Sequence, residues 1–258
     1  MAANGGVDIT ELAARLSKAV ADRSAIGKLT DETPELDLDR AYQVQRLLRD
    51  QAGPRAGWKL GLTSRAKQAQ VGVSTPIYGF LAARHAIDLG APLDTEQLIQ
   101  PRVEPEVVFT LGAELAGPHV TAADVLAATS GLAVGIEVID SRYLDYRFTT
   151  ADVIADNTSA GRYLVGAPVS PTGIDLRLVG VVLEHNGEVV ATASGAASLG
   201  HPAAAVAWLV RALHAVGEGL RAGEVVFSGG LTAAVPVRSG DVVVATIDRL
   251  GPIELAVR

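Results

Sequence analysis

The sequence of 258 residues contains no cysteine, and aromatic residues amount to only 4% of it. A chain without cysteine cannot form a disulfide framework, a thiolate metal site or a cysteine nucleophile. Basic residues are also the minority, with 22 Lys and Arg against 29 Asp and Glu, which gives a formal net charge of −7. Because binding to a nucleic-acid backbone needs a basic face, we predict that nucleic acid is not a partner.

Long uninterrupted apolar runs are missing as well. The longest stretch without a formal charge, residues 189–210, is interrupted by Gly195, Gly200, His201 and Pro202. A helix that spans a membrane needs about 20 predominantly apolar residues, so a loop followed by a helix is the better interpretation. The N-terminus lacks a basic start followed by an apolar core. We therefore expect a soluble cytoplasmic protein without a membrane segment.

Several familiar catalytic motifs are absent. The five histidines are scattered and form no His-x-x-x-His pair, so a zincin-type site has no support. There is no Gly-Lys-Ser/Thr loop, and the glycines of residues 217–223 have the wrong spacing for a dinucleotide fingerprint. These absences exclude the common zinc-protease and nucleotide-binding classes.

The apolar pattern divides the chain into two regions. Residues 9–23 and 39–52 carry apolar side chains every three or four positions, which predicts two helices. From residue 56 short apolar runs follow, and an Asn186-Gly187 pair between two of them is typical of a β-hairpin. We predict strands at 56–62, 103–111, 133–139, 176–185, 188–194, 225–228, 241–247 and 253–257, and further helices at 122–129 and 203–216. The pattern indicates an α+β fold with a helical region 1–55 and a strand-rich catalytic domain 56–258.

Three glutamates occur in predicted strands. Glu104 and Glu106 alternate along one strand and should point to the same face. Glu137 interrupts an otherwise apolar strand, where an unpaired charge is costly. An isolated Glu-x-Glu pair is usually a solvent-facing edge. Three carboxylates from two strands, however, suit a hard divalent ion such as Mg²⁺ or Mn²⁺, whose remaining positions go to water or substrate oxygens.

Four further polar features each have two interpretations. Lys59, inside an apolar strand, is either a surface lysine with a buried stem or a desolvated acid or base. Residues 156–159 form either an Asx-type turn or a donor set for a carboxylate. His201 precedes Pro202, and in the plainer interpretation these residues simply start the following helix. Residues 228–232 form either a plain turn or a backbone-donor loop that approaches a ligand closely.

Taken in chain order, these motifs resemble one known family. The residues that carry the resemblance are Gly57-Trp-Lys-Leu-Gly-Leu-Thr-Ser64, Val103-Glu-Pro-Glu106, Glu137-Val-Ile-Asp-Ser-Arg142 and Ala155-Asp-Asn-Thr-Ser159. They are similar to the 2-keto-4-pentenoate hydratase and 4-oxalocrotonate decarboxylase family, within the fumarylacetoacetate hydrolase superfamily, over nearly the whole chain. The resemblance implies a mixed β-roll core behind the helical region. Pro105 departs from the small residues common at that position, and because proline removes a ladder donor, we expect a local break in strand pairing there.

The resemblance also implies roles for individual residues. It implies a Mg²⁺ or Mn²⁺ site at Glu104, Glu106 and Glu137, and an acid–base role for Lys59. We take Asp156 and Ser159 as further catalytic candidates. The candidates for substrate binding are Ile77, Asn157, His201 and Thr232.

The two branches of the family carry out different reactions. Residues 75–81 resemble the decarboxylases, since Ile77 stands where hydratases typically carry Asp. Residues 98–102 and 124–129 are equally typical of hydratases. Three further segments also resemble the decarboxylases: 141–143, 200–202 and 229–236. The balance favours metal-dependent decarboxylation of 2-oxohex-3-enedioate to 2-hydroxypenta-2,4-dienoate and CO₂, a step of aromatic meta-cleavage catabolism.

Two alternative functions stay open at this stage. Within the enzyme class, hydration of 2-hydroxypenta-2,4-dienoate is the alternative reaction. Outside it, the acidic cluster would be a structural cation site in a binding protein. The resemblance suggests a complex with a partner hydratase, and the sequence leaves a homo-oligomer open. In the enzyme interpretation the small-molecule partner is an oxo-dicarboxylate.

Overall fold

The computed structural model describes residues 7–64, 68–69 and 73–258. Apolar periodicity near the N-terminus produces the two predicted helices, α1 (Ile9–Asp22) and α3 (Leu38–Gln51). Each begins at an aspartate whose side chain accepts backbone N–H groups of the first turn, which otherwise have no partner. The segment between them, for which the sequence predicted no helix, contains α2 (Leu29–Glu32). A helix of one turn is too short to give a periodic signal.

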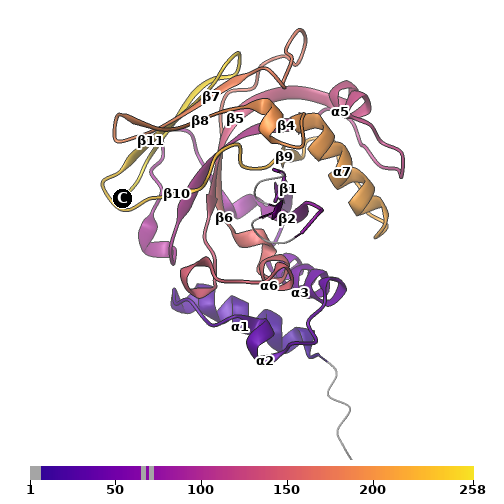
Figure 1. Ribbon diagram of the computed structural model, residues 1–258, viewed down its shortest axis with the longest axis vertical. Helices are drawn as coiled ribbons and strands as arrows, with labels where there is room; N and C mark the ends of the chain where they lie inside the picture. The colour runs from indigo at the N-terminus through magenta and orange to yellow at the C-terminus, as the bar shows by residue number, and fades with distance from the viewer. Residues whose placement is uncertain (1–6, 65–67, 70–72) are drawn as a thin grey trace, which may run out of the picture.

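Two β-sheets form most of the remaining chain. The larger has the strand order β2-β1-β9-β4-β5-β6-β3, with β10 paired to β4, and the smaller has the order β12-β11-β7-β8. The larger sheet consists of β1 (Arg55–Gly61), β2 (Ile77–Ala82), β3 (Ala86–Ile87), β4 (Arg102–Leu111), β5 (Thr129–Ile139), β6 (Ala160–Val165), β9 (Val225–Phe227) and β10 (Val235–Pro236). The smaller sheet consists of β7 (Gly180–His185), β8 (Glu188–Ser194), β11 (Val242–Ile247) and β12 (Gly251–Ala256). The smaller sheet and the helices α1–α3 lie at opposite ends of the molecule (Figure 1).

The strands are followed or interrupted by the α-helices α5 (Ala122–Ala128), α6 (Thr150–Ala155) and α7 (Pro202–His214). Short 3₁₀ turns occur at η1 (Ala83–His85), η2 (Thr95–Gln97), η3 (Leu144–Tyr146), η4 (Asn157–Ser159) and η5 (Gly195–Ala197). Within the described ranges, no helix is both long and apolar enough to cross a bilayer. The predicted α+β class is confirmed by this arrangement of clustered strands with peripheral helices.

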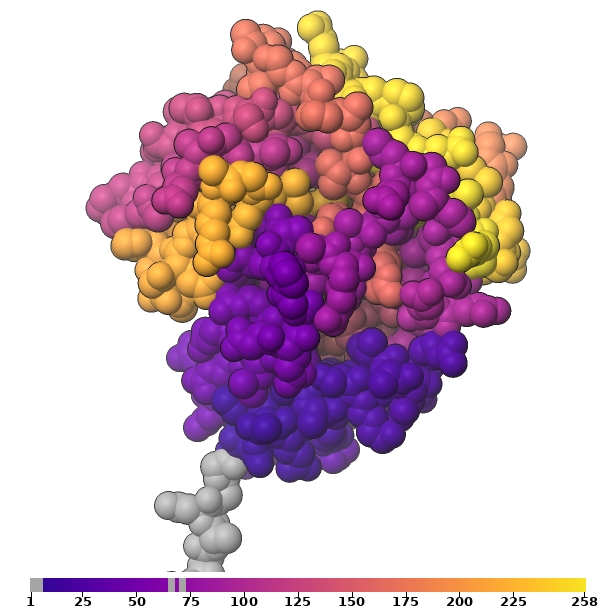
Figure 2. Space-filling model, turned by 180° about the vertical axis from the view of Figure 1, so that it is seen from behind, coloured from indigo at the N-terminus to yellow at the C-terminus, as the bar shows by residue number. Residues whose placement is uncertain are grey.

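Three apolar clusters hold the elements together. The largest joins the larger sheet to α7 and to the smaller sheet. A second lies among α1, α3 and α6 and includes Leu16, Val44 and Ile154. A third covers one face of the larger sheet and consists of Leu81, Val108, Ala133, Tyr163 and Phe227. Figure 2 shows the N-terminal residues, in indigo, gathered at one end of the molecule.

The differences from the predicted elements have local causes. β2, β6 and α6 were not predicted, because a segment of six residues is too short for its pattern to distinguish a strand from a buried helix. The strand expected from Leu176 begins only at Gly180. The predicted hairpin is confirmed, since Asn186 and Gly187 both have positive φ and connect β7 to β8.

The expected break at Pro105 occurs on one edge of β4 only. Pairing with β5 continues through Pro105 and Ile136. On the opposite edge β4 pairs with β10 at Val103 and with β9 from Val108, and between them a loop donates from Leu231 N–H to the Pro105 carbonyl at 3.1 Å. Pro105, which has no backbone N–H, therefore lies where a loop rather than a strand passes beside β4.

Candidate metal centre

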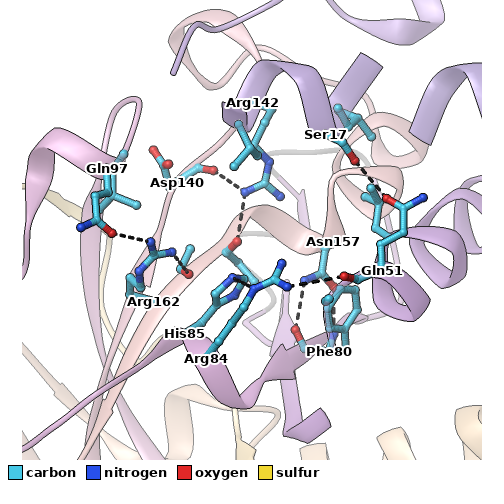
Figure 3. A pocket seen from close by; sticks show the side chains of 17 residues that line it. Ser17, Gln51, Phe80, Arg84, His85, Gln97, Asp140, Arg142, Asn157 and Arg162 are labelled. Carbon is cyan, nitrogen blue, oxygen red and sulfur yellow. Dashed lines mark hydrogen bonds between the residues drawn. The ribbon is translucent and has the colours of Figure 1, made fainter. Parts of the chain in front are cut away.

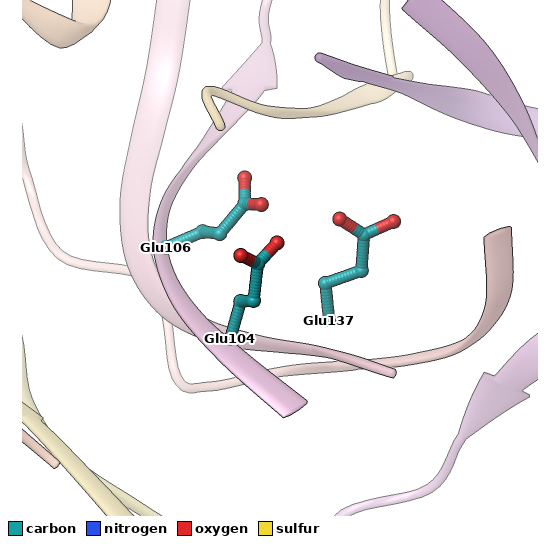
Figure 4. Close-up of side chains that lie close together, drawn as sticks. All are labelled: Glu104, Glu106 and Glu137. Carbon is teal, nitrogen blue, oxygen red and sulfur yellow. The ribbon is translucent and has the colours of Figure 1, made fainter. Parts of the chain in front are cut away.

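The three glutamates meet on one face of the larger sheet. The register of β4 and β5 places Glu104 directly opposite Glu137, and Glu106 lies two residues further along the same face. One carboxylate oxygen from each of the three lies within 4.8 Å of the others, and all three carboxyl groups point into the same space (Figure 4). Glu106 and Glu137 are completely buried and Glu104 is 8% exposed. The alternative of a solvent-facing edge is therefore wrong.

Burial and mutual repulsion dominate the electrostatics of this cluster. Burial raises the pKa of Glu106 well above its usual value, and the neighbouring Glu137 and Glu104 raise it further, against the opposing effects of Lys59 and the Gly229 N–H. Burial also raises the pKa of Glu137, although Lys59 opposes it. Within the described part of the chain, the buried atoms Glu106 Oε1 and Glu137 Oε2 have no hydrogen-bond partner.

These properties fit a divalent cation. Three ionised carboxylates and one ammonium group leave a formal charge of −2, which a divalent ion neutralises. Carboxylate oxygens are the ligands that Mg²⁺ and Mn²⁺ prefer. An ion in this space would also give the two unpaired buried oxygens the partner that such atoms normally have.

Lys59 lies beside the cluster in the central part of β1. Its strand pairs with β2 at Gly79 and with β9 at Phe227, so its side chain shares the glutamates' face of the sheet. The Nζ atom is 3.0 Å from Glu137 Oε1 and donates to the carbonyl of Thr158 at 2.9 Å. Lys59 is 2% exposed, so the alternative of a surface lysine is wrong, and the role of this buried side chain as an acid or base stays a prediction.

The loop that passes β4 contributes backbone rather than side chains. Gly229 has a φ of +104° and donates its N–H to Glu106 Oε2 at 2.6 Å. A Cβ atom at Gly229 would lie 2.0 Å from Thr63 Oγ1, and one at Gly230 would lie 2.5 Å from the carboxyl carbon of Glu104. Only glycine allows this approach. The loop of residues 228–232 is therefore not a plain turn, and its close approach to a ligand stays a prediction.

A strained turn presents the carbonyl that binds Lys59. Asn157, Thr158 and Ser159 all have φ between 50° and 56°, a conformation that costs non-glycine residues of order 1–3 kcal/mol each. Side chains hold it in place, because Asn157 exchanges two hydrogen bonds with the backbone of Phe80 and the Thr158 hydroxyl donates to the Tyr78 carbonyl at 2.9 Å. The turn is closed by the backbone, since the Ser159 N–H donates to the Asp156 carbonyl at 3.0 Å, and it is not an Asx turn because the Asn157 side chain bonds Phe80 instead. Its consequence is the direction of one carbonyl group.

A second buried group of charges anchors this turn. The guanidinium of Arg142 pairs with the Asp156 carboxylate and also donates to the carbonyls of Asp140 and Ala160 at 2.7 and 3.0 Å. Burial raises the pKa of Asp156 to about 6, against the opposing charge of Arg142. The Ser159 hydroxyl is 3.4 Å from Asp156 Oδ2. The sequence motif that contains Arg142 did not reveal this pair, because Arg142 and Asp156 are 14 residues apart.

The other predicted site residues lie in well-defined places. Ile77 is 3% exposed at the start of β2, where a Cβ added to Gly61 would contact both Ile77 and Thr158. His201 caps α7, since its Nδ1 accepts the Ala203 N–H at 3.0 Å. The Thr232 hydroxyl donates to the Ala233 carbonyl at 3.0 Å. Their substrate-binding roles, like that of Asn157, stay predictions.

The chain is similar to known proteins in sequence and in structure. The sequence model described as fumarylacetoacetate hydrolase C-terminal matches residues 58–258. A 4-oxalocrotonate decarboxylase from Pseudomonas sp. strain CF600 is 44% identical over 238 residues, which is 90% of each chain. A 2-keto-4-pentenoate hydratase from Paraburkholderia xenovorans strain LB400 is 38% identical over 248 residues, 94% of this chain and 92% of the hydratase.

The solved structures extend the similarity to three dimensions. A 4-oxalocrotonate decarboxylase from Pseudomonas putida G7, complexed with magnesium and adipate, is 41% identical to this chain and superposes with a TM-score of 0.93 over 97% of both chains. The fold implied by the resemblance, a mixed β core behind an N-terminal helical region, is confirmed.

Proposed function

The chain belongs to the fumarylacetoacetate hydrolase family, and on that premise we propose that it is a carboxy-lyase that converts 2-oxohex-3-enedioate (4-oxalocrotonate) to 2-hydroxypenta-2,4-dienoate and CO₂ with Mg²⁺. One observation carries the proposal: three carboxylates meet in the protein interior beside a buried lysine, and the oxygens Glu106 Oε1 and Glu137 Oε2 have no hydrogen-bond partner among the described residues. The comparisons support it, because the decarboxylase relative is 44% identical and the hydratase relative 38% identical.

The metal would be held by Glu104, Glu106 and Glu137. When bound, Mg²⁺ supplies a Lewis acid that stabilises negative charge on a carbonyl oxygen. Mn²⁺ is the alternative ion for the same oxygen ligands. The backbone N–H of Gly229 fixes the Glu106 carboxylate, so the ligand set is oriented by the loop as well as by the strands.

The reaction breaks the bond between C5 and the distal carboxylate carbon, C6. The electron pair of that bond forms a C4–C5 double bond, the C3–C4 double bond moves to C2–C3, and the 2-oxo oxygen takes up the charge. Protonation of this oxygen gives the dienol, and CO₂ leaves. Lys59 is the proposed proton donor, because its Nζ is held by Glu137 and by the Thr158 carbonyl next to the carboxylate cluster.

The surrounding residues have proposed positioning and binding roles. Asp156 holds the turn through Arg142, and Asn157 fixes it against Phe80, so both act on the direction of the Thr158 carbonyl. The buried Ser159 hydroxyl is proposed to donate to a substrate carboxylate. Ile77 gives an apolar wall that disfavours a charged carboxylate before it leaves. His201 and Thr232 are the remaining proposed substrate contacts.

The domain boundary, the association of the chain with other proteins and its location in the cell are proposed as well. We propose that residues 56–258 form the catalytic domain and that residues 1–55 cover one end of it. Similarity to both decarboxylases and hydratases supports association with further copies or with a hydratase, which light scattering of the protein alone and mixed with a hydratase tests. A cytoplasmic location completes the proposal, and fractionation of expressing cells tests it.

One pair of assays tests the activity. The purified protein with Mg²⁺ should release CO₂ from 2-oxohex-3-enedioate, and EDTA should abolish the release. The same protein should not add water to 2-hydroxypenta-2,4-dienoate at a comparable rate. Water addition without CO₂ release would instead identify a hydratase. Mg²⁺ binding without either reaction would identify a structural cation site in a binding protein.

A further inference from the structure

A second cavity lies apart from the carboxylate cluster, between α1, α3 and the strands β2 and β6. Its volume is about 310 Å³, and neither Lys59 nor the three clustered glutamates line it. Much of its wall is apolar, with Leu16 and Val20 from α1, Leu48 from α3, Phe80 from β2 and Leu98. A space of this size accepts a molecule of about the size of a single aromatic ring with a substituent.

One side of the cavity is basic. Arg84, His85 and Arg162 line it together, and in Figure 3 Arg84 and His85 lie between Arg162 on one side and Gln51 on the other. Arg84 donates to His85 Nε2 at 3.2 Å and to the Gln51 carbonyl, whereas Arg162 donates to the Gly161 carbonyl and to Gln97 Oε1. All four acceptors are uncharged. Neither guanidinium forms an ion pair within the described part of the chain.

The acidic groups near this cavity are already engaged. Both carboxylate oxygens of Asp140 accept backbone N–H groups, from Ile99 at 3.0 and 3.1 Å and from Gln100 at 2.7 Å. Arg142, which also lines the cavity, has Asp156 as its partner. The pKa of the half-buried Arg162 is lowered, by burial first and by the nearby charge of Arg84, although Asp140 opposes this. Two cations that repel each other are thus left facing a largely apolar space.

We propose that this cavity is a second small-molecule site, which binds an organic monoanion with a carboxylate at Arg84 and Arg162 and an apolar body against α1 and α3. Guanidinium groups form strong, directional hydrogen bonds to carboxylates. The apolar wall selects a hydrophobic carboxylate over acetate or inorganic phosphate. The site is also connected to the first one, because Asn157 and Ala160 line the cavity and flank the carbonyl that accepts the Lys59 hydrogen bond.

Benzoate is the probe that matches these features. It is titrated into ¹⁵N-labelled protein in the presence of EDTA, so that a metal-bound carboxylate cannot contribute. We expect amide shifts at His85, Gly161 and Arg162 and a dissociation constant on the order of 0.1–1 mM, typical of a ligand of nine heavy atoms. Benzamide, which has the same shape without the charge, should bind at least tenfold more weakly. Acetate, without the apolar body, should also bind at least tenfold more weakly.

Variants locate the binding. Arg84→Gln and Arg162→Gln should each weaken benzoate binding about tenfold, the usual cost of one charge-assisted hydrogen bond. Ser17→Ala, which removes a polar wall group without changing charge, should bind benzoate as the unchanged protein does. Glu106→Gln should also bind it unchanged, which separates this site from the metal centre. Thermal unfolding of each variant verifies that it is folded.

Three results would overturn the proposal: benzamide binding as well as benzoate, full affinity in a folded Arg84→Gln/Arg162→Gln double variant, or amide shifts confined to the carboxylate cluster. Because binding is measured without metal and without turnover, its outcome is independent of the decarboxylase assay.

Discussion

Two groups of buried charge lie within a few residues of each other in this protein, and they differ in how their hydrogen bonds are completed. At the Arg142–Asp156 pair, each nitrogen of the guanidinium and each oxygen of the carboxylate meets a partner supplied by the chain. At the carboxylate cluster, Glu106 Oε1 and Glu137 Oε2 meet none among the described residues, and the charges sum to −2. A satisfied buried pair supports the fold, whereas an unsatisfied buried cluster is built for a ligand.

This difference has consequences that mutation can separate. A change in the carboxylate cluster should reduce activity without lowering the stability of the metal-free protein. A change at Arg142 should lower the stability of the metal-free protein more than it lowers activity. The two groups are joined by one element, the turn of residues 156–159, so the chain also allows a test of whether the turn transmits a defect from one group to the other.

The largest effect is expected from Glu106→Gln. Loss of a metal ligand should reduce CO₂ release about 10⁴-fold, because several kcal/mol of charge stabilisation disappear. In metal-free protein the same change removes a buried carboxylate repelled by two others, so the free energy of unfolding should rise. Glu188→Gln, at an exposed position, is the matched control and should change neither quantity. Full activity in Glu106→Gln would contradict the metal assignment.

Arg142→Met should have the next largest effect, and on stability. Removing one partner of a buried ion pair leaves Asp156 without compensation, which costs about 3–5 kcal/mol. For a chain of this length the melting temperature should fall by roughly 10 °C. The control is Arg177→Met, whose exposed pair with Asp175 is screened by solvent and should contribute little to stability. Calorimetry measures both. Equal melting temperatures for the two variants would show that the buried pair is not a structural anchor.

Lys59→Met tests the buried lysine that pairs with Glu137. We expect turnover to fall about 10²–10³-fold, the usual contribution of a proton donor. Mg²⁺ affinity, measured by isothermal titration calorimetry, should not decrease, because the carboxylate ligands remain and a competing positive charge has gone. Lys18→Met on exposed α1 is the control. A variant that turns over substrate normally would remove Lys59 from the mechanism, and one that loses Mg²⁺ would assign it a structural role instead.

The smallest effect concerns pH and Asp156. Its pKa is raised from 3.8 to about 6 in the folded protein, so the folded state binds this proton more tightly than the unfolded chain. Binding of this proton therefore stabilises the folded state at low pH by roughly 3 kcal/mol, and this stabilisation is lost as the pH rises through about 6. Denaturant unfolding of the unchanged protein and of Asp156→Asn from pH 4 to 7.5 measures it. The difference in stability between them should favour the unchanged protein increasingly toward pH 4, and a constant difference would contradict this pKa.

Sequence patterns predicted the elements with strong local signals. The helices over 9–23 and 39–52, the β-hairpin at Asn186-Gly187 and the strands that carry the glutamates all follow from periodicity or turn chemistry. Elements of six residues or fewer, such as α6 and β6, were missed because local signals of that length are ambiguous. The boundary between residues 55 and 56 stays a prediction, although α6 packs into the cluster formed by α1 and α3.

The sequence by itself determined which residues carry the chemistry: the alternation of Glu104 and Glu106, a third glutamate in an apolar strand, and Lys59 in another. Only the tertiary structure decided how these groups relate. The pairing of β4 with β5 set Glu104 opposite Glu137, and the strained turn at Thr158 aimed a carbonyl at Lys59 from 99 residues away. Local patterns fix which face a side chain occupies, but partners distant in sequence meet only through strand register and packing.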